Sequence, residues 1–211
     1  MVTIASEKQG LKTKVVEVRR TAAYYLARPA VLLLAKTPIT PNTITWFGFL
    51  LSVGAAALIV TGHLLAAGFL VLVAGLFDLL DGALARYTNK ATHFGAVLDS
   101  TLDRLAEAVL LLGIMILYAR EQSFAGVLLV GIALPSSLLV SYLRAKAEAL
   151  GLECKVGLFT RGERVIVLAL GLLLSSINYY ALIAALGIIV LFSFFTAGQR
   201  LLHVWHQTKP N

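Results

Sequence analysis

The stretch "LLAAGFLVLVAGLFDLLDGALA", residues Leu64–Ala85, decides the fold. It is almost continuously apolar and long enough to cross roughly 30 Å of hydrocarbon as an α-helix, which takes about 20 residues. Lipid offers no hydrogen-bond partner to the backbone, so an apolar run of this length must span as a helix. Asp78 and Asp81 nevertheless lie near its C-terminal end. Because carboxylates are costly beside hydrocarbon, both are candidate functional residues.

The whole chain has the composition of a membrane protein. Hydrophobic residues make up 59% of its 211 residues and charged residues only 14%, whereas soluble domains are about half apolar and about a quarter charged. We therefore expect one polytopic membrane domain over residues 1–211. The net charge of +7 suits anionic lipid headgroups and phosphorylated substrates better than nucleic acid in so apolar a chain.

Six apolar segments are predicted to be transmembrane helices, so the expected fold class is all-α. Their approximate ranges are Thr43–Thr61, Leu64–Ala85, Phe94–Ala119, Phe124–Leu143, Val165–Ile177 and Tyr180–Val204. The fifth segment is short, and we expect it to begin inside Arg161–Arg164. The connections are short, which makes consecutive helices antiparallel neighbours. Residues 39–205 are thus expected to form a six-helix bundle.

The basic residues predict the orientation in the membrane. Of the 18 Lys and Arg residues, only Arg120 falls on the opposite side of the predicted bundle from the rest. Lys and Arg are enriched in cytoplasmic loops. We therefore expect both termini, and the connections after the second and fourth helices, to lie in the cytoplasm.

The N-terminal arm, residues 1–38, is predicted to contain an amphipathic helix. Apolar residues follow helical spacing at Leu11, Val15, Val18, Ala22 and Tyr25. On a helical wheel, the basic residues of the arm fall at other positions than these. Such a helix lies in the membrane interface with its apolar face toward the lipid. A partly ordered basic tail is the alternative.

Four aspartates lie on two predicted helix faces at the cytoplasmic side. Asp78 and Asp81 are three residues apart, and Asp99 and Asp103 are four apart, so each pair shares a face about one turn apart. Without cations, four converging carboxylates would repel one another. Mg²⁺ and Mn²⁺ prefer oxygen ligands, and two such ions can assist displacement at phosphorus. We expect a divalent-metal site with two ions; the alternative is a packed polar layer with Arg86, Lys90 and Arg104.

The aspartates belong to a longer pattern, Asp78-x2-Asp81-Gly82-x2-Ala85-Arg86-x8-Gly95-x3-Asp99-x3-Asp103. The two glycines share the acidic faces and leave room for a phosphate to approach the backbone. The pattern resembles the signature of the CDP-alcohol phosphotransferases, integral membrane enzymes of phospholipid synthesis. In that family a CDP-linked donor yields its phosphoalkyl group to an alcohol and CMP leaves. The resemblance implies that Asp78, Asp81 and Asp99 bind metal, and that Asp103 is shared between the metal and the role of general base.

The resemblance also implies a site for a CDP-lipid donor. "TPNTIT", Thr40–Thr45, opens the first predicted membrane helix, and family members carry a similar Pro-Asn-x-x-Thr stretch near the nucleotide. Taken alone, these are also ordinary helix-capping residues. The expected donor-binding residues are Asn42, Thr45, Asp78, Gly82, Ala85, Arg86, Thr92 and Gly95.

The acceptor side is indicated by two further stretches. Ser141–Gly171 and Gly198–Trp205 resemble bacterial phosphatidylinositol phosphate synthases, which join CDP-diacylglycerol to inositol phosphate and, like similar enzymes, are homodimers. An acceptor that carries its own phosphate needs a basic pocket beside the acidic site. The candidate residues are Arg144, Lys146, Arg161, Arg164 and Arg200. Ordinary positive-inside charges are the alternative interpretation.

Other functions remain open at this point. A phosphatidylglycerophosphate synthase also uses a phosphorylated acceptor, and other members of the family include enzymes of archaeal-type lipids. Membrane prenyltransferases also have Asp-rich metal sites, but the fixed Gly82, Ala85, Arg86 and Gly95 argue against them. A cation transporter would more usually have broken helices or duplicated halves, and the sequence has neither.

Overall fold

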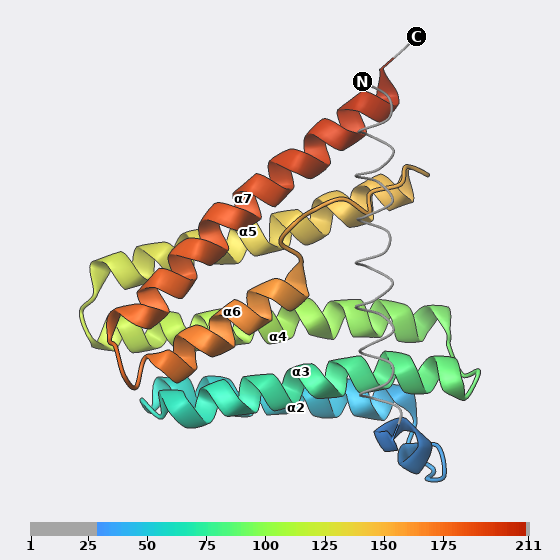
Figure 1. Ribbon diagram of the computed structural model, residues 1–211, viewed down its shortest axis with the longest axis horizontal. Helices are drawn as coiled ribbons and strands as arrows, with labels where there is room; N and C mark the ends of the chain where they lie inside the picture. Colours follow the sequence, from blue (N-terminus) through green and yellow to red (C-terminus); the bar gives the residue numbers. More distant parts are fainter. Residues whose placement is uncertain (1–28, 210–211) are drawn as a thin grey trace.

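A computed structural model describes residues 29–209 of the chain, and the regular structure in that range is helical (Figure 1). A helical stretch at residues 29–34 comes first. The labelled helices are α2 (Pro41–Val60), α3 (Leu64–Tyr87), α4 (His93–Arg120), α5 (Phe124–Ala149), α6 (Arg161–Leu174) and α7 (Tyr180–Thr208). Each overlaps one of the six predicted apolar segments, although α6 ends at Leu174, three residues before the predicted Ile177. The amphipathic helix predicted for the N-terminal arm lies outside the described residues.

The helices form two groups. Helix α2 packs against both α3 and α4, whereas α5 packs mainly against α7 and also contacts α4. In Figure 1, α5 and α7 are tilted away from the first group toward the end where α7 finishes. Helix α6 contacts both α3 and α7. Its first turn therefore lies between the two groups, where it can bring side chains to both.

Small residues let the helices approach closely. A Cβ atom added at Gly68 of α3 would lie 2.8 Å from the Leu173 side chain of α6. At Gly113 of α4, an added Cβ would lie 3.1 Å from the Ala56 carbonyl oxygen of α2. Both distances are too short for a larger residue without movement of the partner helix. Close contact between small residues is the usual way in which membrane helices associate.

Polar residues fix where three of the helices begin. Thr40 caps α2, and its hydroxyl accepts a hydrogen bond from the backbone of Thr43 at 3.3 Å. Thr92 caps α4 in the same manner, with Gly95 N as the donor at 2.9 Å. At α6, the Thr160 backbone N–H donates to Glu163 Oε2 at 2.8 Å. Helix N-termini carry partial positive charge, and these three lie around the acidic site.

Four helices are long and apolar enough to cross a membrane: α2, α3, α5 and α7, with mean hydropathies of 2.0 to 2.4. Large apolar side chains such as Leu191 (67% exposed) point outward from the bundle. This is the arrangement that lipid requires and that water would penalise. The chain is therefore an integral membrane protein. Helix α4 has 28 residues but carries several charges in its first half, and α6 has 14 residues.

Candidate active site

Three of the four aspartates converge. Asp78 of α3 and Asp99 and Asp103 of α4 each offer one carboxylate oxygen, and these oxygens lie within 4.8 Å of one another. All three residues are half-buried. Three negatively charged oxygen ligands from two helices are the donor set that Mg²⁺ and Mn²⁺ favour. We call Asp78, Asp99 and Asp103 the acidic group; its residues fit a divalent cation.

Asp81 lies close to the acidic group but differs from it in burial. It is 4% exposed, and its Oδ2 atom is buried without a hydrogen-bond partner. It lines the same cavity as Asp78 and Asp103. A buried carboxylate oxygen without a partner is costly. A cation at this end of the cavity would compensate for that cost, which supports the expectation that Asp81 is a metal ligand.

Arg161, the first residue of α6, reaches into the acidic group. Its Nη1 atom lies 2.9 Å from Asp78 Oδ2 and 2.6 Å from Asp103 Oδ2. The sequence suggested Arg161 as part of an acceptor pocket, but the structure places it against the carboxylates. The cation that pairs with these aspartates is thus Arg161, and not a residue of the polar layer considered above. Arg104, for example, donates instead to the carbonyl oxygen of Ser100 on its own helix.

A cavity of about 530 Å³ extends from the acidic group between α2, α3, α4 and α6. Its polar end is formed by four charged residues: Asp78, Asp81, Asp103 and Arg161. The rest of its wall is small or apolar and includes Gly48, Val71, Gly75, Leu79, Val165 and Ile166. The cavity therefore matches a molecule with an ionic head and a hydrocarbon body.

The structure brings the predicted donor-binding residues Asn42, Thr92 and Gly95 together. A Cβ atom added at Gly95 would lie 3.2 Å from Asn42 Oδ1 and 3.0 Å from Thr92 Oγ1. This contact joins the beginnings of α2 and α4. A glycine is needed there because a larger side chain would crowd these two oxygens.

The other predicted donor-binding residues lie along α2 and α3. Thr45 is 9% exposed and lines the cavity with Asp81. Arg86 folds across Gly82, because a Cβ atom added at that glycine would lie 3.4 Å from Arg86 Nη1. Ala85 is half-buried on the same helix. The side chain of Arg86 therefore covers the gap that Gly82 leaves.

Sequence reasoning missed Glu107, which lies one turn after Asp103 on α4. Glu107 is 8% exposed and accepts two hydrogen bonds from Arg164, which is 1% exposed. Arg164 Nε donates to Glu107 Oε1 at 2.6 Å, and Arg164 Nη2 donates to Glu107 Oε2 at 2.8 Å. The third nitrogen, Arg164 Nη1, is buried without a partner. The signal was present in the sequence, since Glu107 continues the four-residue spacing of Asp99 and Asp103.

Arg200 of α7 is also buried, at 3% exposure. Its guanidinium donates to two backbone carbonyls, Val156 O at 3.0 Å and Val140 O. These contacts leave Arg200 hydrogen-bonded to carbonyl groups and not to a carboxylate, so its charge is only weakly compensated.

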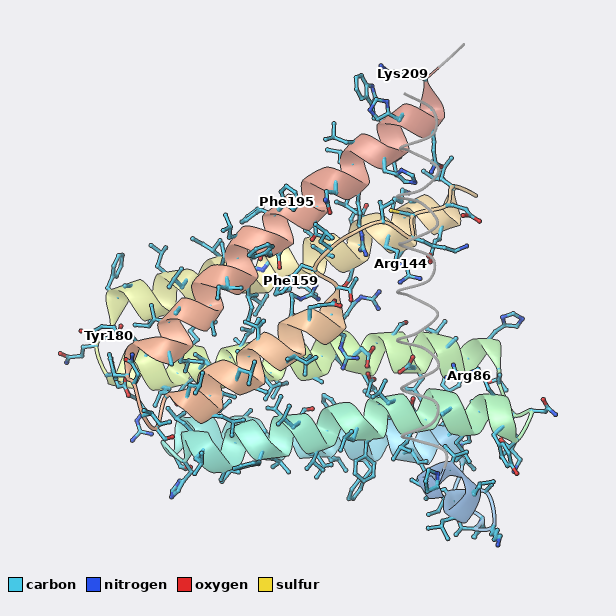
Figure 2. All side chains as sticks on the ribbon, viewed as in Figure 1. Arg86, Arg144, Phe159, Tyr180, Phe195 and Lys209 are labelled. Carbon is cyan, nitrogen blue, oxygen red and sulfur yellow. The ribbon has the colours of Figure 1, made fainter. Side chains whose placement is uncertain are left out.

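The remaining predicted acceptor residues lie toward the end of α5. Arg144 pairs with Glu148 at 2.8 Å, with both side chains about half exposed, and Lys146 is exposed. In Figure 2, Arg144 and Arg86 lie toward the same end of the molecule, and Tyr180 lies at the other. The predicted acceptor residues therefore fall into three sets. Arg161 lies at the acidic group, Arg164 and Arg200 are buried, and Arg144 and Lys146 are exposed.

Comparison with known proteins identifies the family. The CDP-alcohol phosphatidyltransferase family matches residues 38–198. The archaetidylinositol phosphate synthase of Methanothermobacter thermautotrophicus is 40% identical over 167 residues, which cover 79% of this chain and 83% of that protein. The similarity therefore extends over most of both chains.

Solved structures agree with this assignment. The phosphatidylinositol phosphate synthase of Mycobacterium tuberculosis with CDP-DAG bound is 34% identical, with a TM-score of 0.79 over 89% of this chain and 96% of that chain. The same enzyme in complex with manganese and citrate gives a TM-score of 0.77 at 34% identity, covering 88% of this chain and 90% of that chain. The resemblance drawn from the aspartate pattern is confirmed, and the chain belongs to the CDP-alcohol phosphatidyltransferase family.

Proposed function

We propose that this protein transfers the phosphatidyl group of CDP-diacylglycerol to inositol phosphate and releases CMP. The observation that carries the proposal is the pairing of an acidic group at the head of an apolar cavity with two buried arginines nearby. The relatives named above are inositol phosphate lipid synthases from an archaeon and a bacterium. Their shared acceptor supports inositol phosphate as the acceptor of this protein.

The donor is proposed to bind in the cavity. Its acyl chains would lie against the apolar wall, because burying hydrocarbon there is favourable by about 25 cal/mol per Å². Its pyrophosphate and cytidine would then lie at the polar end, beside Asp78 and Asp81. Asn42, Thr92 and Gly95 lie together where α2 and α4 begin, and they would bind the nucleotide part. Arg86 would pair with a phosphate.

The acidic group is proposed to hold divalent metal together with Asp81, and the family expectation is two ions. When bound, Mg²⁺ or Mn²⁺ supplies positive charge that neutralises the donor pyrophosphate and the departing CMP. The fit rests on the three converging oxygens and on the buried, unpartnered Asp81 Oδ2. Manganese in the similar Mycobacterium tuberculosis enzyme supports the choice of ion.

Asp103 is proposed to act as the general base. An acceptor hydroxyl oxygen bonds to the phosphorus of the phosphatidyl group, its proton passes to an Asp103 oxygen, and the bond from phosphorus to the CMP oxygen breaks. Asp103 suits this role because it belongs to the acidic group and its carboxylate pairs with Arg161, the first residue of α6. A positioned base contributes about 10²–10⁴-fold to the rate.

The acceptor phosphate is proposed to bind near Arg164 and Arg200, with Lys146, Arg144 and Arg161 assisting. Arg164 has a free buried donor in Nη1, and Arg200 has a weakly compensated charge. A phosphate would satisfy both. Hydrogen bonds to charged groups contribute about 1.5–3 kcal/mol each, which is enough to select a phosphorylated alcohol over an unphosphorylated one.

The topology proposed for this function places six helices across the membrane as one domain. The acidic group and both termini would then face the cytoplasm, where CDP-lipids and inositol phosphate are available. Helices α4 and α6 would complete the bundle despite their charges or short length. A homodimer stays a prediction from the family resemblance.

An acceptor screen tests the proposal. Purified protein with CDP-diacylglycerol and Mg²⁺ should release CMP fastest with inositol phosphate and more slowly with glycerol phosphate, free inositol or serine. Faster CMP release with glycerol phosphate would replace the proposed acceptor. Equal rates with unphosphorylated alcohols would remove the basic pocket from the account.

A further inference from the structure

Two ion pairs connect α4 to the start of α6. Asp103 pairs with Arg161 at 2.6 Å, and Glu107 pairs with Arg164, also at 2.6 Å. The acidic residues are four apart on α4, and the arginines are three apart on α6, so each set lies on one helix face about one turn apart. The second pair therefore lies one turn farther along both helices than the first, directly next to the proposed base.

The Glu107–Arg164 pair has a geometry that stability alone does not favour. Its side chains are 10% and 1% exposed, so both charges have lost most of their water. A buried ion pair is often no more stabilising than apolar residues of similar volume. Here one guanidinium nitrogen, Nη1, is also buried without a partner, which is a cost to folding. An anion that reaches Nη1 would recover that cost.

We propose that Glu107 is a positioning residue that holds Arg164 for the phosphate of the acceptor. The inference rests on the proposed function, because it needs an acceptor with a phosphate group. The carboxylate of Glu107 binds Nε and Nη2 of Arg164 at once, which fixes the plane of the guanidinium and leaves Nη1 free. Glu107 itself stays behind Arg164 and does not touch the substrate.

A competing electrostatic effect has the opposite sign. The negative charge of Glu107 repels a phosphate, so its loss alone would strengthen acceptor binding. Two substitutions separate charge from position. Glu107→Gln removes the charge and keeps the length of the side chain, whereas Glu107→Asp keeps the charge and moves the carboxylate by one methylene group.

The positioning role predicts that both variants raise the KM for the phosphorylated acceptor by about 10-fold, which corresponds to the loss of one hydrogen bond to a charged group. The KM for CDP-diacylglycerol should stay within about 2-fold of the parent value, because such a change is under 0.5 kcal/mol. If charge alone mattered, Glu107→Gln would lower the acceptor KM and Glu107→Asp would leave it unchanged. If the pair only stabilised the fold, the melting temperature would fall with no change in either KM. Either of these results overturns the proposal.

A double-mutant cycle with Arg164→Lys supplies a second measurement. Lys has no planar fork, so the Glu107 substitutions should have little further effect on the acceptor KM in that background. If the Glu107 and Arg164 substitutions instead multiply in their effects on the acceptor KM, Glu107 does not act through Arg164. If Glu107→Gln does not fold, Glu107→Asp and its cycle still decide the question.

The parent enzyme separates this proposal from the acceptor assignment. If it prefers glycerol phosphate, inositol phosphate is the wrong acceptor, and the Glu107 variants are measured with glycerol phosphate. If it prefers inositol phosphate but the variants keep its KM, the acceptor stands and the positioning role fails. If it uses unphosphorylated alcohols equally well, both proposals fail.

Discussion

Nη1 of Arg161 lies 2.6 Å from Oδ2 of Asp103, and the same nitrogen bridges to Asp78 at 2.9 Å. An arginine from α6 thus contributes positive charge to the carboxylates that are proposed to bind metal. Opposite charges at this separation attract one another, and a metal ion would have to share these oxygens or displace the guanidinium. Arg161 and the metal are therefore expected to compete.

Arg161→Gln should bind Mn²⁺ more tightly than the parent protein. In EDTA its melting temperature should fall, because the repulsion between Asp78 and Asp103 is no longer offset. Adding Mn²⁺ should then raise the melting temperature by more than in the parent, since a tighter ligand of the folded state stabilises it further. The matched control is Arg104→Gln, whose guanidinium bonds a backbone carbonyl on its own helix. An equal response to Mn²⁺ in the parent and in Arg161→Gln would exclude competition.

Asp78→Asn, Asp81→Asn and Asp99→Asn should each abolish CMP release, and EDTA should do the same to the parent enzyme until Mg²⁺ or Mn²⁺ is restored. The reason is the loss of one hard oxygen ligand from a site that has few. Glu153→Gln is the control, because Glu153 is an exposed carboxylate that pairs with Lys155 at 3.2 Å. Full turnover in EDTA by folded protein would refute the metal site.

Asp103→Asn should lower kcat by about 10²–10⁴-fold while CDP-diacylglycerol binding changes much less. The amide keeps the shape of the side chain but cannot accept the acceptor's proton. Donor binding and single-turnover rates, measured across pH, separate the two effects. Near-normal turnover at any pH would remove Asp103 from the mechanism.

Gly75→Leu should raise the KM for CDP-diacylglycerol. Gly75 lines the cavity, and a Cβ atom added there would have Val165 as its nearest neighbour at 3.9 Å, so a larger side chain would enter the space proposed for an acyl chain. Overpacking of this kind costs about 1–3 kcal/mol, or roughly 5–150-fold in KM. Gly131→Leu on α5 is the control, because the space around Gly131 is open and lies outside the cavity. An unchanged donor KM in Gly75→Leu would place the acyl chains elsewhere.

The six helices could be located from hydropathy because a long apolar run in lipid must satisfy its own backbone hydrogen bonds as a helix. Their ends differ where polar sequence continues a helix beyond the apolar run. Helix α5 was expected to end at Leu143 but continues to Ala149. Helix α6 begins at Arg161, inside the range Arg161–Arg164 that was expected for its start. The Thr160 and Glu163 pair at that start is a capping signal that was readable in the sequence.

The acidic group could be predicted because residues three or four apart share a helix face. The partners of the arginines could not, because they depend on how α6 packs against distant helices. Arg161 and Asp78 are 83 residues apart, and Arg164 and Glu107 are 57 apart. The count of basic residues indicated a site for phosphate, but only packing distinguishes Arg161 at the carboxylates from Arg200 at the backbone carbonyls.

The most direct test of the account is the mass of the lipid product formed in competition. Purified protein, CDP-diacylglycerol and Mg²⁺ are mixed with equal concentrations of inositol phosphate and glycerol phosphate, with Asp78→Asn as the inactive control. The expected main product is phosphatidylinositol phosphate, with one CMP released for each lipid formed and no product from the control. Phosphatidylglycerophosphate as the main product, or CMP release without a new phospholipid, would contradict it.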